Sequence, residues 1–225
     1  MKQLALELAS PPAPTLDNFV VGGNAEVVAA LRAFARGDSR EHCIYLWGGS
    51  GSGRTHLLCA TLQALRETGR IARLYTAPDG IGAAAANDAI GVDDVQHLSA
   101  PAQIELFNIF NELSDGSGML VVTGDVPPAR LPLRADLQTR LAWGLVYEVH
   151  ALSEDDRRRA VLGYAAARGF ELPREVADYL LARVPRDLDS LRAMVDLLDR
   201  LSLEQKRAIT VPLAREVLQA AQHRD

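Results

Sequence analysis

Apolar residues gather in five short runs along the first two thirds of the chain, and segments with helical spacing separate most of them. The runs are Ile44–Trp47, Ala72–Thr76, Ala89–Asp93, Met119–Thr123 and Leu145–Val149. Strands that alternate with helices in this way are typical of a parallel sheet covered by helices on both faces. We therefore expect a five-stranded α/β domain over residues 15–152.

The last third of the chain has a different pattern. After Leu152 no strand-like run occurs, and apolar positions recur at helical spacing. Ser153, followed by three acidic residues, resembles a helix N-cap. Further helices fit Arg174–Val184, Leu188–Leu201 and Pro212–Ala221. The pattern predicts a small all-helical domain over residues 153–225.

The first apolar run leads into a glycine-rich loop with the phosphate-binding spacing G-x-x-x-x-G-K-[ST], except that arginine replaces lysine. The loop consists of Gly48, Gly49, Ser50, Gly51, Ser52, Gly53, Arg54 and Thr55. Successive backbone N–H groups in such a loop can cradle nucleotide phosphates at the start of a helix. That helix is expected over Thr55–Leu65, with Gly69 as its stop. A glycine-rich turn without a ligand is the plainer alternative.

The arginine at the lysine position changes what the loop can do. A lysine ammonium is a compact point charge, whereas the guanidinium of Arg54 is wider and planar. The chain has only two lysines, Lys2 and Lys206, among 24 basic residues, so a general preference for arginine could also explain the replacement. We expect nucleotide binding to survive the replacement better than catalysis does.

Acidic residues follow two of the other runs. Asp93 and Asp94 end the third run, where Asp93 together with Thr55 could coordinate Mg²⁺. Asp94 could orient or deprotonate an attacking water. Asp125 follows the fourth run, where it could sense the terminal phosphate or simply form a turn. The sequence therefore predicts a nucleotide site at the carboxyl ends of these strands.

Composition narrows the class of protein. Hydrophobic residues make up 48% of the 225 residues, which supports a packed core, and the net charge of −5 argues against a strong stand-alone nucleic-acid binder. Cys43 and Cys59 lie in apolar segments and are expected to be small buried residues in a reducing compartment. Because Glu7 interrupts any apolar signal core and no run approaches membrane-spanning length, we expect a cytoplasmic protein without a membrane partner.

The order of these motifs resembles one known family. The order is a P-loop, an acidic strand pair, Thr123-Gly124-Asp125 and then Arg140-Leu141-Ala142-Trp143-Gly144. It is similar to that of the AAA+ module in the bacterial replication-initiator family DnaA. Within that family, Arg54 and residues 124–128 and 168–173 resemble the Hda-type regulators, which promote inactivation of the initiator. The resemblance covers about residues 15–221.

The resemblance implies further site residues, with ADP or ATP and Mg²⁺ as cofactors. Phe19 and Val20 match the family's N-terminal segment beside the adenine. His56 adjoins the loop and joins the candidate nucleotide contacts, although an incidental position is the plainer explanation. Arg140 matches the arginine finger, a cation offered to the γ-phosphate of a neighbouring subunit and worth roughly 10³–10⁵ in rate. Without the family match, a solvated helix charge explains Arg140 equally well. Trp143 is expected to pack rather than to contact a ligand.

The N-terminal peptide resembles the short peptides that dock on the DNA polymerase sliding clamp. In an extended segment Leu4, Leu6 and Leu8 point the same way and can enter one apolar pocket, while Gln3 bonds at its rim. Taken alone, a frayed tail or a sheet-edge strand explains such a peptide better. We expect residues 1–14 to form a flexible clamp-binding tail and tether.

The nucleotide-sensing arginine of the family's lid has no direct counterpart. It should fall within residues 185–192, where Asp189 takes the matching place. Arg186 and Arg192 lie one turn to either side, and either could substitute for it.

These features support two functions of different classes. The first is a negative regulator of replication initiation that, with the DNA-loaded sliding clamp, stimulates hydrolysis of the ATP bound to DnaA by offering Arg140. The second is an autonomous AAA+ ATPase, such as a helicase loader, that uses Asp93, Asp94 and Arg140 within its own homo-oligomer. A P-loop small-molecule kinase is disfavoured because no acceptor-substrate constellation is present. Since the initiators' DNA-reading domain follows the lid, and the sequence ends at Asp225, we expect DNA contact to be only indirect or weak.

Overall fold

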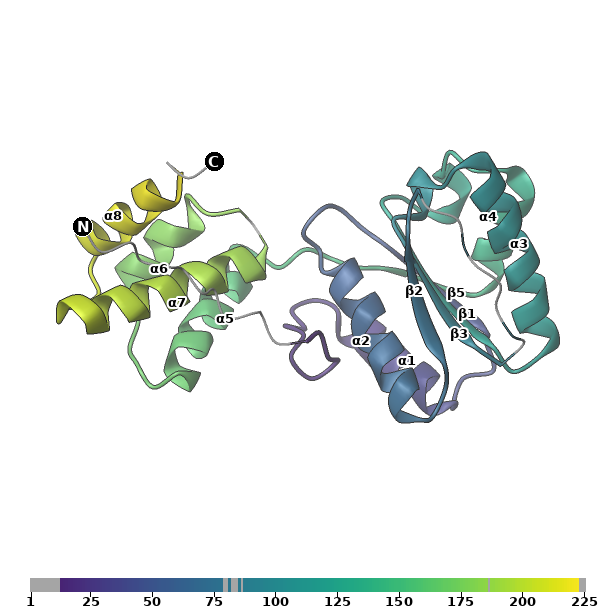
Figure 1. Ribbon diagram of the computed structural model, residues 1–225, viewed down its shortest axis with the longest axis horizontal. Helices are drawn as coiled ribbons and strands as arrows, with labels where there is room; N and C mark the ends of the chain where they lie inside the picture. Colours follow the sequence, from purple (N-terminus) through teal and green to yellow (C-terminus); the bar gives the residue numbers. More distant parts are fainter. Residues whose placement is uncertain (1–12, 79–80, 82–84, 86, 186, 223–225) are drawn as a thin grey trace. The chain divides into compact units, whose positions relative to one another are not determined.

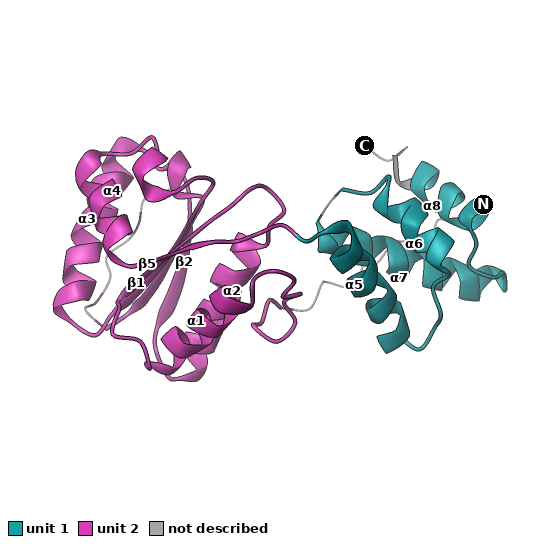
Figure 2. Ribbon diagram, turned by 180° about the vertical axis from the view of Figure 1, so that it is seen from behind, with its two compact units in different colours: residues 1–12, 152–225 teal, residues 13–151 magenta. Residues whose placement is uncertain are grey.

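The computed structural model describes residues 13–78, 81, 85, 87–185 and 187–222. Contacts divide these residues into two compact units, and the boundary lies at Leu152 (Figure 2). The larger unit comprises the described residues up to Ala151, and the smaller unit comprises the remainder. No helix in the described part of the chain is long and apolar enough to cross a membrane.

The larger unit is built on one parallel sheet of five strands (Figure 1). The strands are β1 (Cys43–Trp47), β2 (Ala72–Thr76), β3 (Ala89–Asp93), β4 (Met119–Gly124) and β5 (Leu145–Glu148). Their order across the sheet is β2-β3-β4-β1-β5, and every neighbouring pair is parallel. The predicted five-stranded α/β domain is confirmed, with strand limits that differ by a single residue at most.

Burial along the strands follows their position in the sheet. Every residue of β3 and β4 is buried, because central strands of a parallel sheet are covered on both faces. The edge strands β2 and β5 alternate between half-buried and exposed positions toward their ends. Gly91 in β3 packs closely against α2, since a Cβ there would lie 2.5 Å from Cδ1 of Leu62 and would force that side chain to shift. The centre of the sheet is therefore buried beneath helices on both faces.

Four helices cover the two faces of the sheet. They are α1 (Ala25–Arg36), α2 (Arg54–Glu67), α3 (Ala100–Asp115) and α4 (Ala135–Trp143), with short 3-10 turns η1 (Val95–His97) and η2 (Pro128–Arg130). In Figure 1, α1 and α2 lie on one face and α3 and α4 on the other. Because side chains alternate along a strand, Ile44 packs under the first pair and Tyr45 under the second.

The two cysteines differ in their burial. Cys43 in β1 is buried, and desolvation, assisted by the negative charge of Glu41, raises its pKa to about 12. Cys59 in α2 is only half-buried. The expectation of two buried thiols is therefore right for Cys43 and wrong for Cys59, whose position on α2 leaves one side of it open.

The smaller unit consists of four helices around its own apolar core. They are α5 (Glu154–Ala167), α6 (Arg174–Leu181), α7 (Leu188–Gln205) and α8 (Val211–Gln222). The predicted cap of α5 is confirmed, since Oγ of Ser153 accepts a hydrogen bond from the N–H of Asp156 at 3.1 Å. The helix predicted as Arg174–Val184 ends earlier, at Leu181, shortly before Pro185. The predicted all-helical domain is confirmed.

Candidate functional site

The glycine-rich loop turns at the carboxyl end of β1 and leads directly into α2. A Cβ at Gly48 would lie 2.3 Å from the carbonyl oxygen of Val149, so the backbone passes too close for any side chain. Gly53 caps α2 with φ +96°, and a Cβ there would lie 2.8 Å from the ring of Phe19. Close packing and a left-handed backbone therefore both require glycine in this loop. The arrangement places the start of α2 beside the loop, which is the geometry of an anion-binding site.

The predicted metal-binding pair joins the first turn of α2, which carries Thr55, to the end of β3, which carries Asp93. Oγ1 of Thr55 donates a hydrogen bond to Oδ2 of Asp93 at 2.9 Å, and Asp93 is only 7% exposed. Oγ1 of Thr123 donates to the other oxygen, Oδ1, at 2.5 Å. The same Thr123 oxygen accepts from the backbone N–H of Asp94 at 2.9 Å. Thr123 thus holds both acidic residues, a role that the sequence did not reveal.

Arg54 reaches from α2 toward the ends of β3 and β4. Its Nη1 donates to the carbonyl oxygen of Gly124, and its Nη2 lies 3.3 Å from Oδ1 of Asp94. Asp125, the residue predicted to sense phosphate or to form a turn, is exposed. Its neighbour Gly124, rather than Asp125, is therefore the residue of this strand end that contacts Arg54.

The loop and its neighbours offer hydrogen-bond donors that suit phosphate oxygens, and oxygen ligands that suit a hard cation. Among the described residues, the buried Oγ of Ser52 has no hydrogen-bond partner, which leaves a donor available for a bound group. No set of three His, Cys, Asp or Glu side chains in the described part of the chain could hold a metal by itself. Mg²⁺ is commonly bound by one or two protein oxygens together with substrate phosphates. Thr55 and Asp93 fit that pattern, and the remaining ligands would come from phosphate and water.

The N-terminal segment of the larger unit packs against the same loop. The ring of Phe19 lies 5.5 Å from the ring of His56, measured between centroids. A ring nitrogen of His56, Nε2, lies 3.0 Å from the carbonyl oxygen of Thr15. Val20 follows Phe19 along the chain and is half-buried. The structure therefore brings Phe19 and His56 beside the start of α2.

Arg140 lies in the last turn of α4, on the other face of the sheet. Its guanidinium carbon is 4.2 Å from the ring centroid of Trp143, 5.6 Å from that of Phe107 and 5.8 Å from that of Phe110. Trp143 is 62% exposed, so its ring packs against Arg140 and not in the core. No ion pair of Arg140 occurs with any residue that the structure describes. Phe107 and Phe110 were not singled out from the sequence, although their spacing of three along α3 puts them on one helix face.

Comparisons with known proteins agree with this geometry. The model of the Hda lid domain matches residues 154–218, and the model of the bacterial DnaA ATPase domain matches residues 83–148. Domain III of the replication initiation protein DnaA from Thermotoga maritima is 25% identical with a TM-score of 0.75, over 93% of this chain and 97% of that one. The chain is a DnaA- and Hda-related AAA+ protein.

Two other solved structures show the same fold as this AAA+ protein. AMPPCP-bound DnaA from Aquifex aeolicus is 24% identical with a TM-score of 0.69, over 84% of this chain and 66% of that one. The Holliday junction branch migration motor RuvB from Thermotoga maritima is 15% identical with a TM-score of 0.68, over 92% of this chain and 72% of that one.

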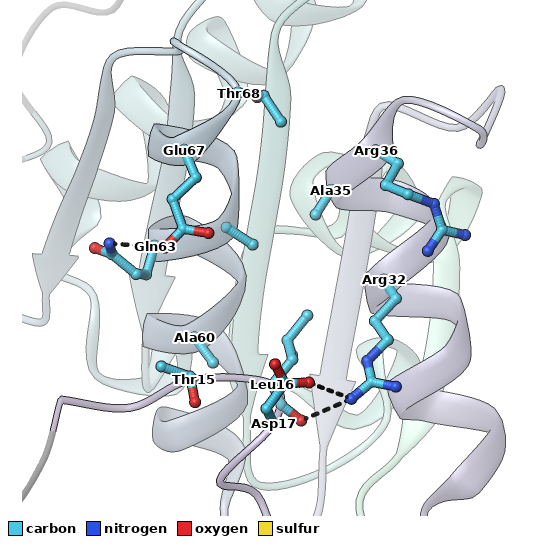
Figure 3. Close-up of a pocket in the computed structure, with 11 residues that line it drawn as sticks. Thr15, Leu16, Asp17, Arg32, Ala35, Arg36, Ala60, Gln63, Glu67 and Thr68 are labelled. Carbon is cyan, nitrogen blue, oxygen red and sulfur yellow. Dashed lines mark hydrogen bonds and ion pairs between the residues drawn. The ribbon is translucent and has the colours of Figure 1, made fainter.

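The AAA+ unit also has a hollow of about 420 Å³ between α1 and α2 (Figure 3). Its lining contains none of residues 48–55. Nη2 of Arg32 bonds Oδ1 of Asp17 at 2.7 Å and the carbonyl oxygen of Leu16 at 3.3 Å at its border. The hollow is therefore separate from the phosphate-binding loop, and its cationic wall is already paired.

In the lid, Arg192 contacts neighbouring lid residues. Its guanidinium carbon lies 5.6 Å from the ring centroid of Tyr164, and Nη1 lies 3.6 Å from Oδ1 of Asp189. Arg168 approaches the same ring at 5.8 Å and pairs with Asp196 at 3.1 Å. These contacts link α5 to α7 within the lid.

Several predicted residues lie outside the described part of the chain. They are the clamp-binding residues Gln3, Leu4, Leu6 and Leu8 and the alternative lid arginine Arg186. Their proposed roles therefore stay predictions of this AAA+ sequence.

Proposed function

We propose that this protein binds ADP or ATP with Mg²⁺ at residues 48–55. Support comes from the loop at the start of α2, the unpartnered Oγ of Ser52 and the hydrogen-bonded pair of Thr55 and Asp93. The related DnaA from Aquifex aeolicus is bound to AMPPCP in its solved structure, which agrees with a nucleotide at this position. Thr55 and Asp93 would hold Mg²⁺, which would supply positive charge to offset the negative charge of the phosphates. Phe19, Val20 and His56 would lie toward the base, and Asp125 toward the terminal phosphate.

We further propose that the protein is a negative regulator of replication initiation that acts on a DnaA-type initiator. It would dock on the DNA-loaded sliding clamp and offer Arg140 to the ATP of an initiator subunit. The observation that carries this proposal is the environment of Arg140. Its guanidinium rests against three aromatic rings, and among the described residues no carboxylate pairs with it. A cation in that state can meet a phosphate of another molecule without first breaking an ion pair of its own.

The chemistry would take place in the initiator. A water oxygen bonds to the γ-phosphorus while the bond from that phosphorus to the bridging oxygen breaks, which gives ADP and inorganic phosphate. Negative charge builds on the transferring oxygens, and a nearby guanidinium stabilises it. The exposed position of Trp143 beside Arg140 favours an action on a partner over an action within the same molecule.

The test is an assay of initiator ATP hydrolysis with DNA-loaded clamp, in the presence and absence of this protein. The complete chain should accelerate hydrolysis, and Arg140→Ala should not. Arg130→Ala, a change at another exposed arginine of the same unit, is the matched control and should retain the stimulation. Stimulation that is equal with and without Arg140 would refute the proposed finger.

The clamp interaction has its own test. Changing Leu4→Ala together with Leu6→Ala should abolish binding to the sliding clamp, because the two side chains would fill one apolar pocket. Binding of AMPPCP by the same variant should be unchanged, since the loop at residues 48–55 is intact. Clamp binding that persists in the double variant would remove the N-terminal peptide from the proposal.

An autonomous AAA+ ATPase, such as a helicase loader, is the second candidate. The hydrogen-bonded set of Asp93, Thr55 and Thr123 favours it, because this set could support hydrolysis within the chain itself. Steady ATP turnover by the purified protein without initiator or clamp would support this candidate over the regulator.

A further inference from the structure

Arg54, which stands at the lysine position of the loop, is already bonded to two acceptors of its own chain. It is the first residue of α2, and its side chain is only 13% exposed. Nη1 donates to the carbonyl oxygen of Gly124, and Nη2 lies 3.3 Å from Oδ1 of Asp94. The guanidinium therefore bridges the carboxyl ends of β4 and β3.

Asp94 is held in this position from two sides. Its backbone has the left-handed φ of +51°, which is uncommon for a residue other than glycine. Its N–H donates to Oγ1 of Thr123 at 2.9 Å, and its Oδ1 accepts a second hydrogen bond from Nε2 of Gln96 at 3.2 Å. A left-handed residue fixed by such contacts is often part of a functional site. The carboxylate is thus kept near Arg54 by its backbone and by Gln96.

The two acceptors, the carbonyl oxygen of Gly124 and the carboxylate of Asp94, suit the planar guanidinium of arginine better than the ammonium group of lysine. A guanidinium presents five N–H donors in a rigid plane, so two of its nitrogens can be bonded at the same time. A lysine ammonium is a compact charge on a flexible stem, and rotation of its last bonds can move it from a carboxylate to a phosphate. Arginine at position 54 therefore favours the bridged arrangement, whereas lysine would favour contact with phosphate.

We propose that Arg54 is a brake on nucleotide hydrolysis by this chain itself. In the hydrolysis that Arg54 would restrain, a carboxylate orients the attacking water and accepts its proton as the bond to the γ-phosphorus forms. Asp94 stands where that carboxylate is expected, but Arg54 occupies its Oδ1 and offsets its charge. The chain then holds a nucleotide without consuming it. This inference rests on the nucleotide binding proposed above and does not involve Arg140.

Arg54→Lys tests the brake by a gain of activity. In the complete chain, the release of inorganic phosphate from ATP with Mg²⁺ should rise about tenfold or more, because Asp94 is set free. The rise should disappear when Asp94→Asn is added to Arg54→Lys. Arg66→Lys is the matched control, since Arg66 lies on the same helix and, among the described residues, its side chain donates only to the backbone carbonyl of Ala72.

A second readout does not depend on activity. In the chain loaded with AMPPCP, exchange of the Arg54 guanidinium protons with water, followed by NMR, should be slow, and Asp94→Asn should accelerate it. Equal exchange in both chains would overturn the brake. It would also be overturned by an Arg54→Lys chain that binds AMPPCP and yet hydrolyses ATP no faster. A parent chain that binds no AMPPCP in calorimetry would overturn the nucleotide binding itself, and the brake with it.

Discussion

Arg54 and Arg140 belong to the same unit but have opposite surroundings. Arg54 is enclosed, and oxygen acceptors of its own chain take up its Nη groups. Arg140 lies against aromatic rings at the end of α4. A ring attracts a cation through its face but takes little of its hydrogen-bonding capacity, so the N–H donors of Arg140 remain available to oxygen atoms of another molecule. The comparison teaches that the neighbours of an arginine decide whether it acts within its own chain or beyond it.

The largest effect is expected for Arg140→Ala. If Arg140 supplies charge to the initiator's transition state, its removal should lower the clamp-dependent stimulation by about 10³-fold or more. The measurement is the rate of initiator ATP hydrolysis with DNA-loaded clamp. If the stimulation falls by less than about fivefold, Arg140 acts as an ordinary surface charge and not on the initiator's nucleotide. The proposed difference between Arg140 and Arg54 would then be wrong.

Gly124→Ala should disturb the strand end whose carbonyl oxygen accepts a hydrogen bond from Arg54. A Cβ at Gly124 would lie 1.9 Å from Oη of Tyr45, a buried residue whose hydroxyl donates to the carbonyl oxygen of Val126. Such overpacking should lower the free energy of unfolding by about 1–3 kcal/mol, as measured by urea titration. Gly163→Ala is the control, because nothing lies within 4 Å of a Cβ there and alanine in a helix interior should stabilise by about 0.5–1 kcal/mol. Equal stability of the two variants would contradict a rigid support for Arg54.

Trp143→Ala should have a smaller effect, which concerns the stimulation of initiator ATP hydrolysis by Arg140. A cation–π contact at an exposed site contributes about 0.5–1 kcal/mol, so the stimulation by Arg140 should fall by roughly two- to fivefold. The fall should appear in kcat of the initiator reaction, and Trp143→Phe should restore most of it. The free energy of unfolding should change by less than about 0.5 kcal/mol, because Trp143 is mostly exposed.

The smallest effect is expected on the alkylation of the thiols of Cys43 and Cys59. Burial raises the pKa of Cys43 to about 12, so at pH 8 only about one thiol in 10⁴ is the reactive thiolate. Burial also raises the pKa of Cys59, with a contribution from Asp93, but this thiol is half-buried and should be alkylated first as pH rises. Cys43 lies in the core under α4, so its protection should be the same in Trp143→Ala and in the parent chain. Early labelling of Cys43 in that variant would show that α4 has loosened.

Local sequence was sufficient for the strands, for the loop at residues 48–55 and for the cap of α5. Each depends on residues close together in the chain, such as a continuous apolar run or a serine before acidic residues. Glycine at positions 48 and 53 is required by the local turn and by close packing, and the motif already contains both. The kind of fold and the position of the phosphate-binding loop could therefore be predicted.

The contacts of the site depended on the strand order, which the sequence did not reveal. Thr123 meets Asp93 and Asp94 only because β4 lies between β3 and β1. Similarly, the rings of Phe107 and Phe110 reach Arg140 because α3 packs beside α4. Such neighbours are far apart in the chain, and no local pattern specifies them.

In the lid, the guanidinium groups of Arg168, which follows α5, and of Arg192 in α7 lie against the ring of Tyr164, whose hydroxyl donates to Asp196 at 2.9 Å. Neither α5 nor α7 can slide along the other without separating that ring from Arg192 or that hydroxyl from its carboxylate. These contacts therefore fix α5 and α7 against each other within the lid. A displacement of α7 along its axis would then have to break these contacts or carry α5 with it.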